Sequence, residues 1–228
     1  FFTIHDGKSF KTFGTAQDHK RVLEGDKGKN TGGMGAYSPS RLINDDLEHK
    51  IIEKIIKPTL RGLDELDSEY KGFLYTGLMI VDDEPYLIEY NVRMGDPECQ
   101  TIIPKLKTDL LDILLACCEE KLNETKIEWL NKKSLCIVVC SNGYPDSFKK
   151  NIEIENLNQI LSDKDEFIFH AGTEKKNDKI YAVGGRVLNF VALSDDFKKA
   201  KESIVNNIKK LNWSGGFYRR DIGHKVIK

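Results

Sequence analysis

The stretch 85–93 constrains the fold of this chain more than any other, because its residues alternate as they do in a β-strand with one apolar and one polar face. Successive side chains of a strand point to opposite faces, so Glu89, Asn91 and Arg93 share one face. The apolar run 74–81 and a turn at 82–84 precede it, which predicts a hairpin. We expect the other face to be buried in a core; it carries Tyr86, Ile88, Tyr90 and Val92.

The polar face has two interpretations. A strand with one solvated face is the simpler one, since burying polar side chains without partners costs several kcal/mol each. A divalent cation is the alternative, because Mg²⁺ binds oxygen ligands and often takes only one or two from the protein. Glu89 offers an anionic oxygen and Asn91 a neutral one, while the Arg93 guanidinium can bind phosphate oxygens. This interpretation predicts a magnesium site, or a manganese site, beside a phosphate.

Apolar periodicity elsewhere predicts an α+β fold in two domains. Helices are expected at 45–60, 109–122 and 195–211. The polar stretch 123–133 separates a first domain, 1–124, from a second domain, 133–228. The further strands are expected at 1–13, 135–140, 167–171, 180–183 and 186–193.

The charges of the chain nearly balance. Its 35 basic and 36 acidic residues give a formal net charge of −1, which provides no long-range field for nucleic acid or anionic lipid. No apolar run approaches the roughly 20 residues of a membrane-spanning helix. The 5 cysteines include no CxxC pair and are expected to be reduced thiols of a cytoplasmic protein. We therefore expect a monomer that binds small molecules, and neither nucleic acid nor membrane.

The residues that follow the polar strand resemble a known family. The string RMGDPECQ at 93–100 resembles the signature of the phosphoribosylamine–glycine ligases, which are ATP-grasp enzymes of purine biosynthesis. Met94 stands where Phe or Leu is more usual. The resemblance covers essentially the whole chain, because further strings match the same family in the same order, at 17–21, 30–39, 75–79, 170–173 and 184–188.

The resemblance implies the carboxyl-terminal part of an ATP-grasp domain followed by a small α+β lobe. In this family an amino-terminal domain and the first part of the ATP-grasp region come earlier in the chain, and the latter supplies the adenine pocket. A chain that begins at Phe1 is therefore expected to bind ATP weakly and to be inactive alone. The implied reaction joins glycine to 5-phosphoribosylamine with ATP, through glycyl phosphate, and gives glycinamide ribonucleotide, ADP and phosphate.

The resemblance also implies roles for individual residues. Glu-x-Asn is the general ATP-grasp magnesium pattern, and many of these enzymes add a carboxylate on the preceding strand, where Gly77 stands here. Arg93, Asp96 and Lys20 would take part in catalysis. Asp96 and Glu98 would either hold the glycine amine or order Arg93. The expected substrate-binding residues are Asp18, Gly32, Gly33, Gly35, Glu98 and Arg186.

Simpler interpretations exist for these loops. The mixed charges at 18–21, and His19 in particular, are typical of a solvated loop, and a glycine-rich stretch such as 30–38 is typical of a turn. Two other functions also stay open. One is another ATP-grasp carboxylate–amine ligase that uses formate or bicarbonate, and the other is a nucleotide-binding or assembly module without catalysis. The string at 93–98 favours the glycine ligase.

Overall fold

The computed structural model describes residues 1–160 and 163–227, which form two compact units. The α+β class is confirmed in both. The sequence predicted two domains, 1–124 and 133–228, each a continuous stretch of chain. The structure instead groups 16–38 and 96–105 with the carboxyl-terminal residues. Unit 1 comprises Phe1–Thr15, Pro39–Gly95 and Leu106–Leu130, and unit 2 comprises Ala16–Ser38, Asp96–Lys105 and Asn131–Lys228.

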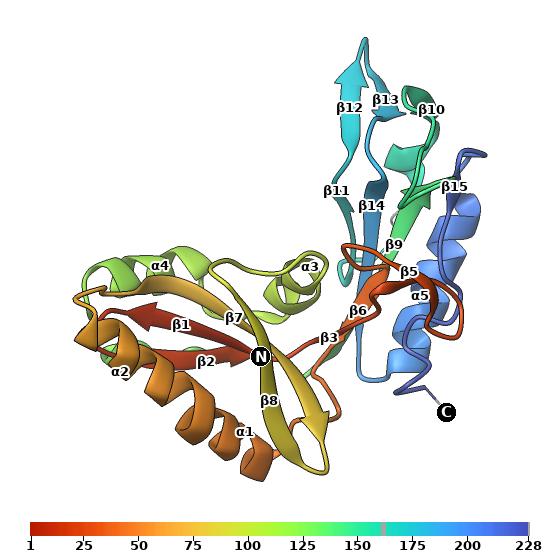
Figure 1. The fold of residues 1–228 in the computed structure, drawn as a ribbon. Coiled ribbons are helices and arrows are strands. Elements are labelled where there is room, and N and C mark those ends of the chain that lie inside the picture. The colour runs from red at the N-terminus through yellow and green to blue at the C-terminus, as the bar shows by residue number, and fades with distance from the viewer. Residues whose placement is uncertain (161–162, 228) are drawn as a thin grey trace. The chain divides into compact units, whose positions relative to one another are not determined.

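Unit 1 is built on a four-stranded antiparallel sheet with the order β2-β1-β7-β8 (Figure 1). The predicted hairpin is confirmed, since β7 and β8 pair across a turn at Asp82 and Asp83, whose φ angles are 51° and 58°. Two successive left-handed residues match the twist of a tight hairpin. The strands of this sheet are β1 (Phe2–Asp6), β2 (Phe10–Gly14), β7 (Lys71–Val81) and β8 (Glu84–Asn91).

Helices lie on both sides of this sheet (Figure 1). Asn44 caps the first of them, because its Oδ1 accepts from the Leu47 N–H at 2.9 Å. This helix buries Leu47 and Ile51, which pack with Phe1 and Ile56 into a small core. The helical elements of unit 1 are α1 (Asp45–Ile51), a π-helical turn (Ile52–Ile56), α2 (Lys57–Glu65), α4 (Leu110–Cys118) and a 3₁₀ turn (Leu122–Glu124).

The apolar face predicted for the polar strand is not a core face. Tyr86, Ile88 and Val92 are 56%, 63% and 72% exposed. Two features of β8 explain the error. It is an edge strand, and it carries a bulge: Glu89 pairs with Gly77 and Leu87 with Leu78, so Ile88 is an extra residue and the alternation is broken there.

Unit 2 is built on a six-stranded sheet with the order β11-β14-β9-β6-β3, in which β15 also pairs with β9. The central strand β9 is buried along almost its whole length, as a strand covered on both faces should be. The sheet thus joins the region predicted as the loop 17–38 to strands more than 95 residues away. Its strands are β3 (Gln17–Asp18), β6 (Gly35–Ser38), β9 (Lys133–Ser141), β11 (Glu166–His170), β14 (Arg186–Ser194) and β15 (Gly216–Phe217).

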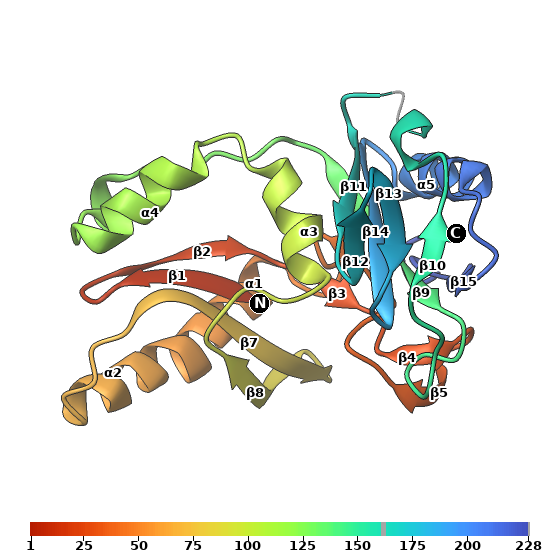
Figure 2. The same cartoon turned by 90° about the horizontal axis from the view of Figure 1, so that it is seen from above.

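The remaining elements of unit 2 surround this sheet. The long helix α5 (Phe197–Lys210) lies along it in both views (Figures 1 and 2), and Asp196 caps it by accepting from the N–H groups of Lys198 and Lys199. The core between them includes Ile137, Phe190 and Ile204. The smaller elements are β4 (Arg21–Leu23), β5 (Lys27–Asn30), α3 (Glu98–Ile102), β10 (Ile152–Ile154), β12 (Thr173–Lys176), β13 (Lys179–Ala182) and 3₁₀ turns at Ile103–Lys105 and Leu157–Gln159.

The structure also bears on membrane-spanning helices and on the state of the cysteines. Within residues 1–160 and 163–227 no helix is long and apolar enough to cross a membrane. The cysteines are all free thiols, with Cys117, Cys136 and Cys140 buried. Burial raises the pKa of the Cys140 thiol to about 12, so this thiol stays protonated and unreactive at neutral pH.

Candidate functional site

The polar strand of unit 1 presents its three predicted side chains as one connected row. Asn91 Nδ2 donates to Glu89 Oε1 at 3.2 Å, and Arg93 Nη2 donates to Asn91 Oδ1 at 3.2 Å. Arg93 Nη1 also donates to the carbonyl of Met94 at 2.9 Å, which holds the guanidinium close to the end of β8. Glu89 and Asn91 therefore share a face of β8, as predicted, and Arg93, two residues beyond the end of this strand, is joined to them by a hydrogen bond.

Gly77 faces this row from the neighbouring strand. It pairs with Glu89 in the register of the hairpin, as expected, and a Cβ at Gly77 would lie 3.1 Å from Glu89 Cγ. A glycine at this place leaves room for the Glu89 side chain and adds no carboxylate. No group of three or more His, Cys, Asp or Glu side chains in the described ranges could hold a metal ion.

The donor set of this row fits a magnesium ion with few protein ligands. Glu89 and Asn91 would supply oxygen ligands, and the remaining positions of an octahedral ion would be left for water or phosphate oxygens. The Glu89 side chain is exposed, and its hydrogen bond from Asn91 can be exchanged for a cation. Arg93 would then be available for phosphate oxygens, because guanidinium groups bind them with paired hydrogen bonds.

Arg186 is the centre of a second cluster, which lies wholly in unit 2. It opens β14, and its Nη2 donates to Asp96 Oδ2 at 2.9 Å. Its Nη1 donates to the carbonyls of Asp96 at 2.6 Å and Gly32 at 2.9 Å. Gln100 Nε2 donates to the other oxygen, Asp96 Oδ1, at 3.0 Å. Arg186 thus ties the glycine-rich segment to the segment after Gly95, and fixes the orientation of the Asp96 carboxylate.

The glycines of this segment are required by close packing. Gly33 has φ of +124°, and a Cβ there would lie 2.6 Å from Pro97 Cδ. At Gly35 a Cβ would lie 2.5 Å from the carbonyl oxygen of Cys136. Two of the glycines expected to bind substrate have backbone N–H groups with partners within unit 2: the Gly33 N–H donates to Thr31 Oγ1 at 3.0 Å and the Gly32 N–H to Tyr144 Oη at 3.0 Å.

The charged residues before this segment form local pairs. Lys20 Nζ lies 3.0 Å from Asp18 Oδ2, and the ammonium remains half exposed. Thr31 fixes the backbone here, since its N–H and its hydroxyl both donate to the Lys20 carbonyl at 2.8 Å. Glu98, by contrast, is buried at the first position of α3. Lys20 and Asp96 therefore present polar atoms to solvent, whereas Asp18 Oδ2 and the Glu98 side chain are buried.

His19 is buried rather than solvated, so that prediction was wrong. Its ring centroid lies 5.4 Å from that of His224 and 6.0 Å from that of Tyr37, and its Nε2 accepts from the Gly223 N–H at 3.4 Å. Burial, with the positive charge of Arg219 nearby, lowers the pKa of His19 to about 4. The imidazole is therefore neutral at pH 7, and it holds the 17–21 segment against the end of the chain.

Arg219 is a structural residue of this region that sequence reasoning missed. The side chain is 1% exposed, and its fork donates to Asp221 through Nε at 2.8 Å and Nη2 at 2.7 Å. Nη2 also pairs with Asp26 at 3.0 Å, and Nη1 donates to the Arg21 carbonyl at 2.8 Å. Asp221 Oδ2 accepts in turn from the Gly25 N–H at 2.8 Å. We refer to Arg219, Asp221 and Asp26 as the clamp.

The clamp fixes the 17–30 segment by electrostatics as well as by geometry. Burial alone would raise the pKa of Asp221, but hydrogen bonds from Arg219 and the Gly25 N–H outweigh it and lower this pKa to about 2. Nothing in the spacing of the sequence around 219 distinguishes it from the neighbouring exposed Arg220. Its burial depends on pairing between segments almost 200 residues apart, which no local pattern reveals.

Comparison with known proteins matches both parts of the chain to one family. The model of the phosphoribosylglycinamide synthetase ATP-grasp (A) domain matches residues 1–99, and that of the phosphoribosylglycinamide synthetase C domain matches residues 134–225. The first match contains the row on β8 and the 17–38 segment. The second contains Arg186 and the clamp residues of the carboxyl-terminal end.

Individual relatives agree over the full length of this chain. Phosphoribosylamine–glycine ligase of Brucella melitensis is 42% identical over 228 residues, which are all of this chain and 53% of that protein. The enzyme of the same name from Caldanaerobacter subterraneus is 44% identical over 97% of this chain and 52% of its own length. The chloroplastic enzyme of Arabidopsis thaliana is 41% identical. The chain thus spans about half the length of the curated relatives it matches.

Solved structures show the same architecture. The crystal structure of phosphoribosylamine–glycine ligase from Thermotoga maritima has a TM-score of 0.86 and 33% identity, and it covers 97% of this chain and 54% of that chain. The biotin carboxylase domain of a thermophilic 2-oxoglutarate carboxylase has a TM-score of 0.64 at 13% identity. The second likeness concerns the fold alone.

Proposed function

Because the chain belongs to the phosphoribosylglycinamide synthetase family, and carries parts of its ATP-grasp and C domains, we propose that it serves the ATP-dependent joining of glycine to 5-phosphoribosylamine. The observation that carries this proposal is the hydrogen-bonded row of Glu89, Asn91 and Arg93 on β8, which leads directly into Asp96. A row of carboxylate, amide and guanidinium suits the phosphates of ATP with a divalent cation.

The reaction needs an activated carboxyl group. A glycine carboxylate oxygen attacks the γ-phosphorus of ATP, the bond to the bridging oxygen breaks, and ADP leaves. The amine of 5-phosphoribosylamine then attacks the acyl carbon of glycyl phosphate, phosphate leaves, and the amine loses a proton. These steps depend on positioning and charge neutralisation more than on an enzyme nucleophile.

Magnesium, or manganese, would be held by Glu89 and Asn91. When bound, it supplies positive charge that neutralises the phosphate oxygens during transfer. Arg93 adds a second positive group on the same face, and its hydrogen bond to the Met94 carbonyl limits the positions that its guanidinium can take. Gly77 contributes no second carboxylate, so we propose that Glu89 and Asn91 are the two metal ligands that this hairpin supplies.

We assign the substrate contacts in unit 2 by exposure. Asp96 is partly exposed, and its carboxylate is fixed by Arg186 and Gln100, so it suits the glycine ammonium group. Buried Glu98 takes a structural role at the start of α3. Lys20, paired with Asp18, suits the sugar phosphate, because an ammonium group can exchange a carboxylate for a phosphate.

Arg186 acts through Asp96 in this assignment. All of its observed hydrogen bonds go to Asp96 and to the Gly32 carbonyl, so it is a positioning residue. The packed glycines Gly33 and Gly35 likewise shape the segment rather than binding the substrate themselves. The free thiols support a reducing compartment such as the cytoplasm, and we propose a monomer whose partners are small molecules.

Glu89→Gln tests the metal assignment in the full-length protein. We expect the activity to fall by at least about tenfold at ordinary magnesium concentrations, because losing one of few ligands weakens metal binding. Thermal unfolding should be unchanged, since Glu89 is exposed. Glu84→Gln is the matched control, on the same strand but paired with Lys50 and Lys54, and it should keep full activity. Normal turnover by Glu89→Gln would remove Glu89 from the site.

A further inference from the structure

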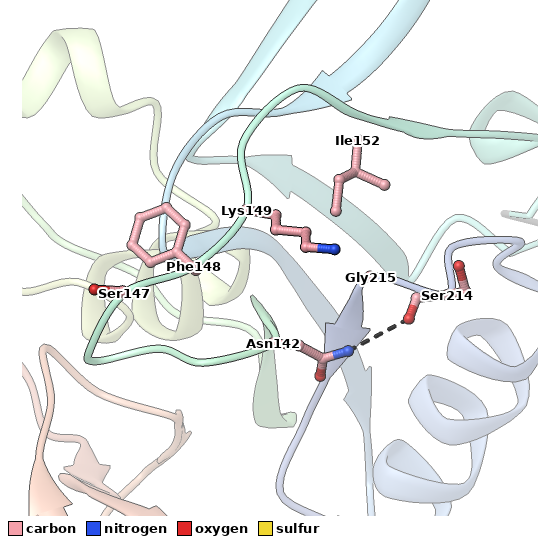
Figure 3. Close-up of a pocket in the computed structure, with 7 residues that line it drawn as sticks. All are labelled: Asn142, Ser147, Phe148, Lys149, Ile152, Ser214 and Gly215. Carbon is pink, nitrogen blue, oxygen red and sulfur yellow. Dashed lines mark hydrogen bonds between the residues drawn. The ribbon is translucent and has the colours of Figure 1, made fainter.

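A cavity of about 620 Å³ opens in unit 2 where β9 ends, and it belongs to none of the groups described above (Figure 3). It is formed by the segment after β9, which supplies Asn142 and Lys149, by Ile152 of β10, and by Ser214 and Gly215 before β15. Its volume lies in the range of sites that bind small molecules. The Asn142 amide donates to the Ser214 carbonyl at 3.4 Å, which links its two sides.

The lining carries positive charge and hydrogen-bond donors. Figure 3 shows the Lys149 side chain extending toward the space between Ile152 and Gly215. No acidic residue lines the cavity within the described part of the chain. Most lysines that the structure describes have a carboxylate partner, for example Lys29 with Asp146, but no such pair involves Lys149. The amide of Asn142 and the hydroxyl of Ser214 add uncharged donors.

A second observation also points to a ligand. Trp213 is 8% exposed, and among the residues that the structure describes its indole Nε1 has no hydrogen-bond acceptor. A buried N–H group without an acceptor is unfavourable and is uncommon in native proteins. A Cβ at Gly215 would lie 2.8 Å from this Nε1 and 2.9 Å from Ile152 Cδ1, and both Gly215 and Ile152 line the cavity. The indole N–H therefore lies directly behind the wall of the cavity that Gly215 and Ile152 form.

We propose that this cavity binds a small phosphomonoester. Its phosphate pairs with the Lys149 ammonium and accepts hydrogen bonds from the Asn142 amide and the Ser214 hydroxyl, and its organic part lies against Ile152. A phosphate offers several acceptor oxygens to one cation and several donors, which matches this lining. The cavity is also much larger than a free phosphate ion. With a net charge of −1 the chain provides no long-range attraction, so affinity depends on these local groups.

The indole N–H signals of the two tryptophans provide the test, because Trp213 packs against Gly215 of the cavity wall and Trp129 lies in unit 1. The ¹⁵N-labelled chain is titrated with phenyl phosphate, and Trp129→Phe assigns the two signals. We expect a saturable shift of the Trp213 signal only. Phenol, which lacks the phosphate, should cause none. A shift that does not saturate, or an equal response to phenol, overturns the proposal.

Matched variants decide which group binds. Lys149→Gln should weaken the affinity for phenyl phosphate by about tenfold or more, because a charge-assisted hydrogen bond is lost. Its neighbour Lys150 is exposed and does not line the cavity, so Lys150→Gln should bind as the parent does. Equal affinity of Lys149→Gln and the parent overturns the proposal. Inorganic phosphate that binds as tightly as phenyl phosphate would also overturn it, since the organic part would then contribute nothing.

This experiment is independent of the ligase reaction. It requires no turnover, and Lys20→Gln, which changes the proposed sugar-phosphate contact, should leave the Trp213 response unchanged. If Lys20→Gln abolished that response, the ligand would be bound at the 17–38 segment and not in this cavity. If the full-length protein showed no ligase activity but the Trp213 signal still responded to phenyl phosphate, the proposed function would fail and the proposal for this cavity would stand.

Discussion

Replacing Arg219 by methionine should lower the free energy of unfolding of unit 2. The guanidinium is 1% exposed and its loss leaves Asp221 without either of its Arg219 hydrogen bonds. Removing one partner of a buried ion pair typically costs about 3–5 kcal/mol. Asp221 keeps the Gly25 N–H and Asp26 is one-third exposed, so we expect the lower end, about 3 kcal/mol.

Urea denaturation followed by the fluorescence of Trp213, in a Trp129→Phe background, measures this loss in unit 2. With a slope of about 2–3 kcal/mol/M, the midpoint should fall by about 1–1.5 M. Arg220→Met is the matched control, because Arg220 is exposed and only its backbone N–H contacts Glu24. That control should change stability by no more than about 0.5 kcal/mol. If Arg219→Met and Arg220→Met unfolded at the same midpoint, the clamp would not stabilise the fold.

The same comparison has a defined pH dependence. The pKa of Asp221 is lowered from 3.8 to about 2 in the folded state, so its contribution to stability is fully present above pH 4. It is lost as the pH falls toward 2, because the protonated carboxyl no longer pairs with Arg219. Arg219 also lowers the pKa of His19, so the comparison is made in a His19→Gln background. There the destabilisation caused by Arg219→Met should be constant from pH 7 to about pH 4 and shrink below that.

Three further predictions concern His19, Gly33 and Arg186 of unit 2, with Gly62 of unit 1 as one comparison. The pKa of His19 is lowered to about 4, so the unfolded imidazole takes up a proton before the folded one does. The fold should therefore become less stable as the pH falls from about 6.5 to 4, by about 3 kcal/mol at most. His19→Gln should flatten the pH dependence of the urea midpoint. Gly33→Ala should destabilise the fold by about 2 kcal/mol or more, since its Cβ would lie 2.6 Å from Pro97 Cδ. Gly62 is a helical residue with nothing within 4 Å of its Cβ position, so Gly62→Ala should stabilise the fold by up to about 1 kcal/mol; thermal unfolding measures both. Arg186→Lys in the full-length protein should raise the KM for glycine by about tenfold with a smaller change in kcat, because Asp96 loses its fixed orientation. An unchanged KM for glycine would show that Asp96 does not need Arg186.

The sequence predicted the row on β8 because alternation along a strand is a local property. Glu89 and Asn91 share a face whatever else the chain does. The same alternation failed for Tyr86, Ile88 and Val92, which it placed in a core. Periodicity shows which side chains share a face, but it does not show what covers that face, and it cannot detect the extra residue of a bulge.

The grouping of 16–38 with the carboxyl-terminal residues could not be predicted in the same way. β6 pairs with β9 through backbone hydrogen bonds, and these are independent of local residue type. Arg219 and His19 were missed for the same reason, since a charged side chain is buried only when distant partners meet it. The string at 93–98 predicted a role for Asp96, but only the structure shows that Arg186 holds its carboxylate.

The central claim is that the row on β8 and the cluster around Asp96 serve the ligation of glycine. Phosphate release by the full-length protein, measured with ATP, magnesium, glycine and 5-phosphoribosylamine, tests it most directly. We predict that release requires both glycine and 5-phosphoribosylamine, and that alanine supports it poorly. The loops at 17–38 and 96–98 offer few apolar side chains to accept an extra methyl group. Equal rates with formate or bicarbonate in place of glycine would contradict the assignment and favour a related carboxylate–amine ligase.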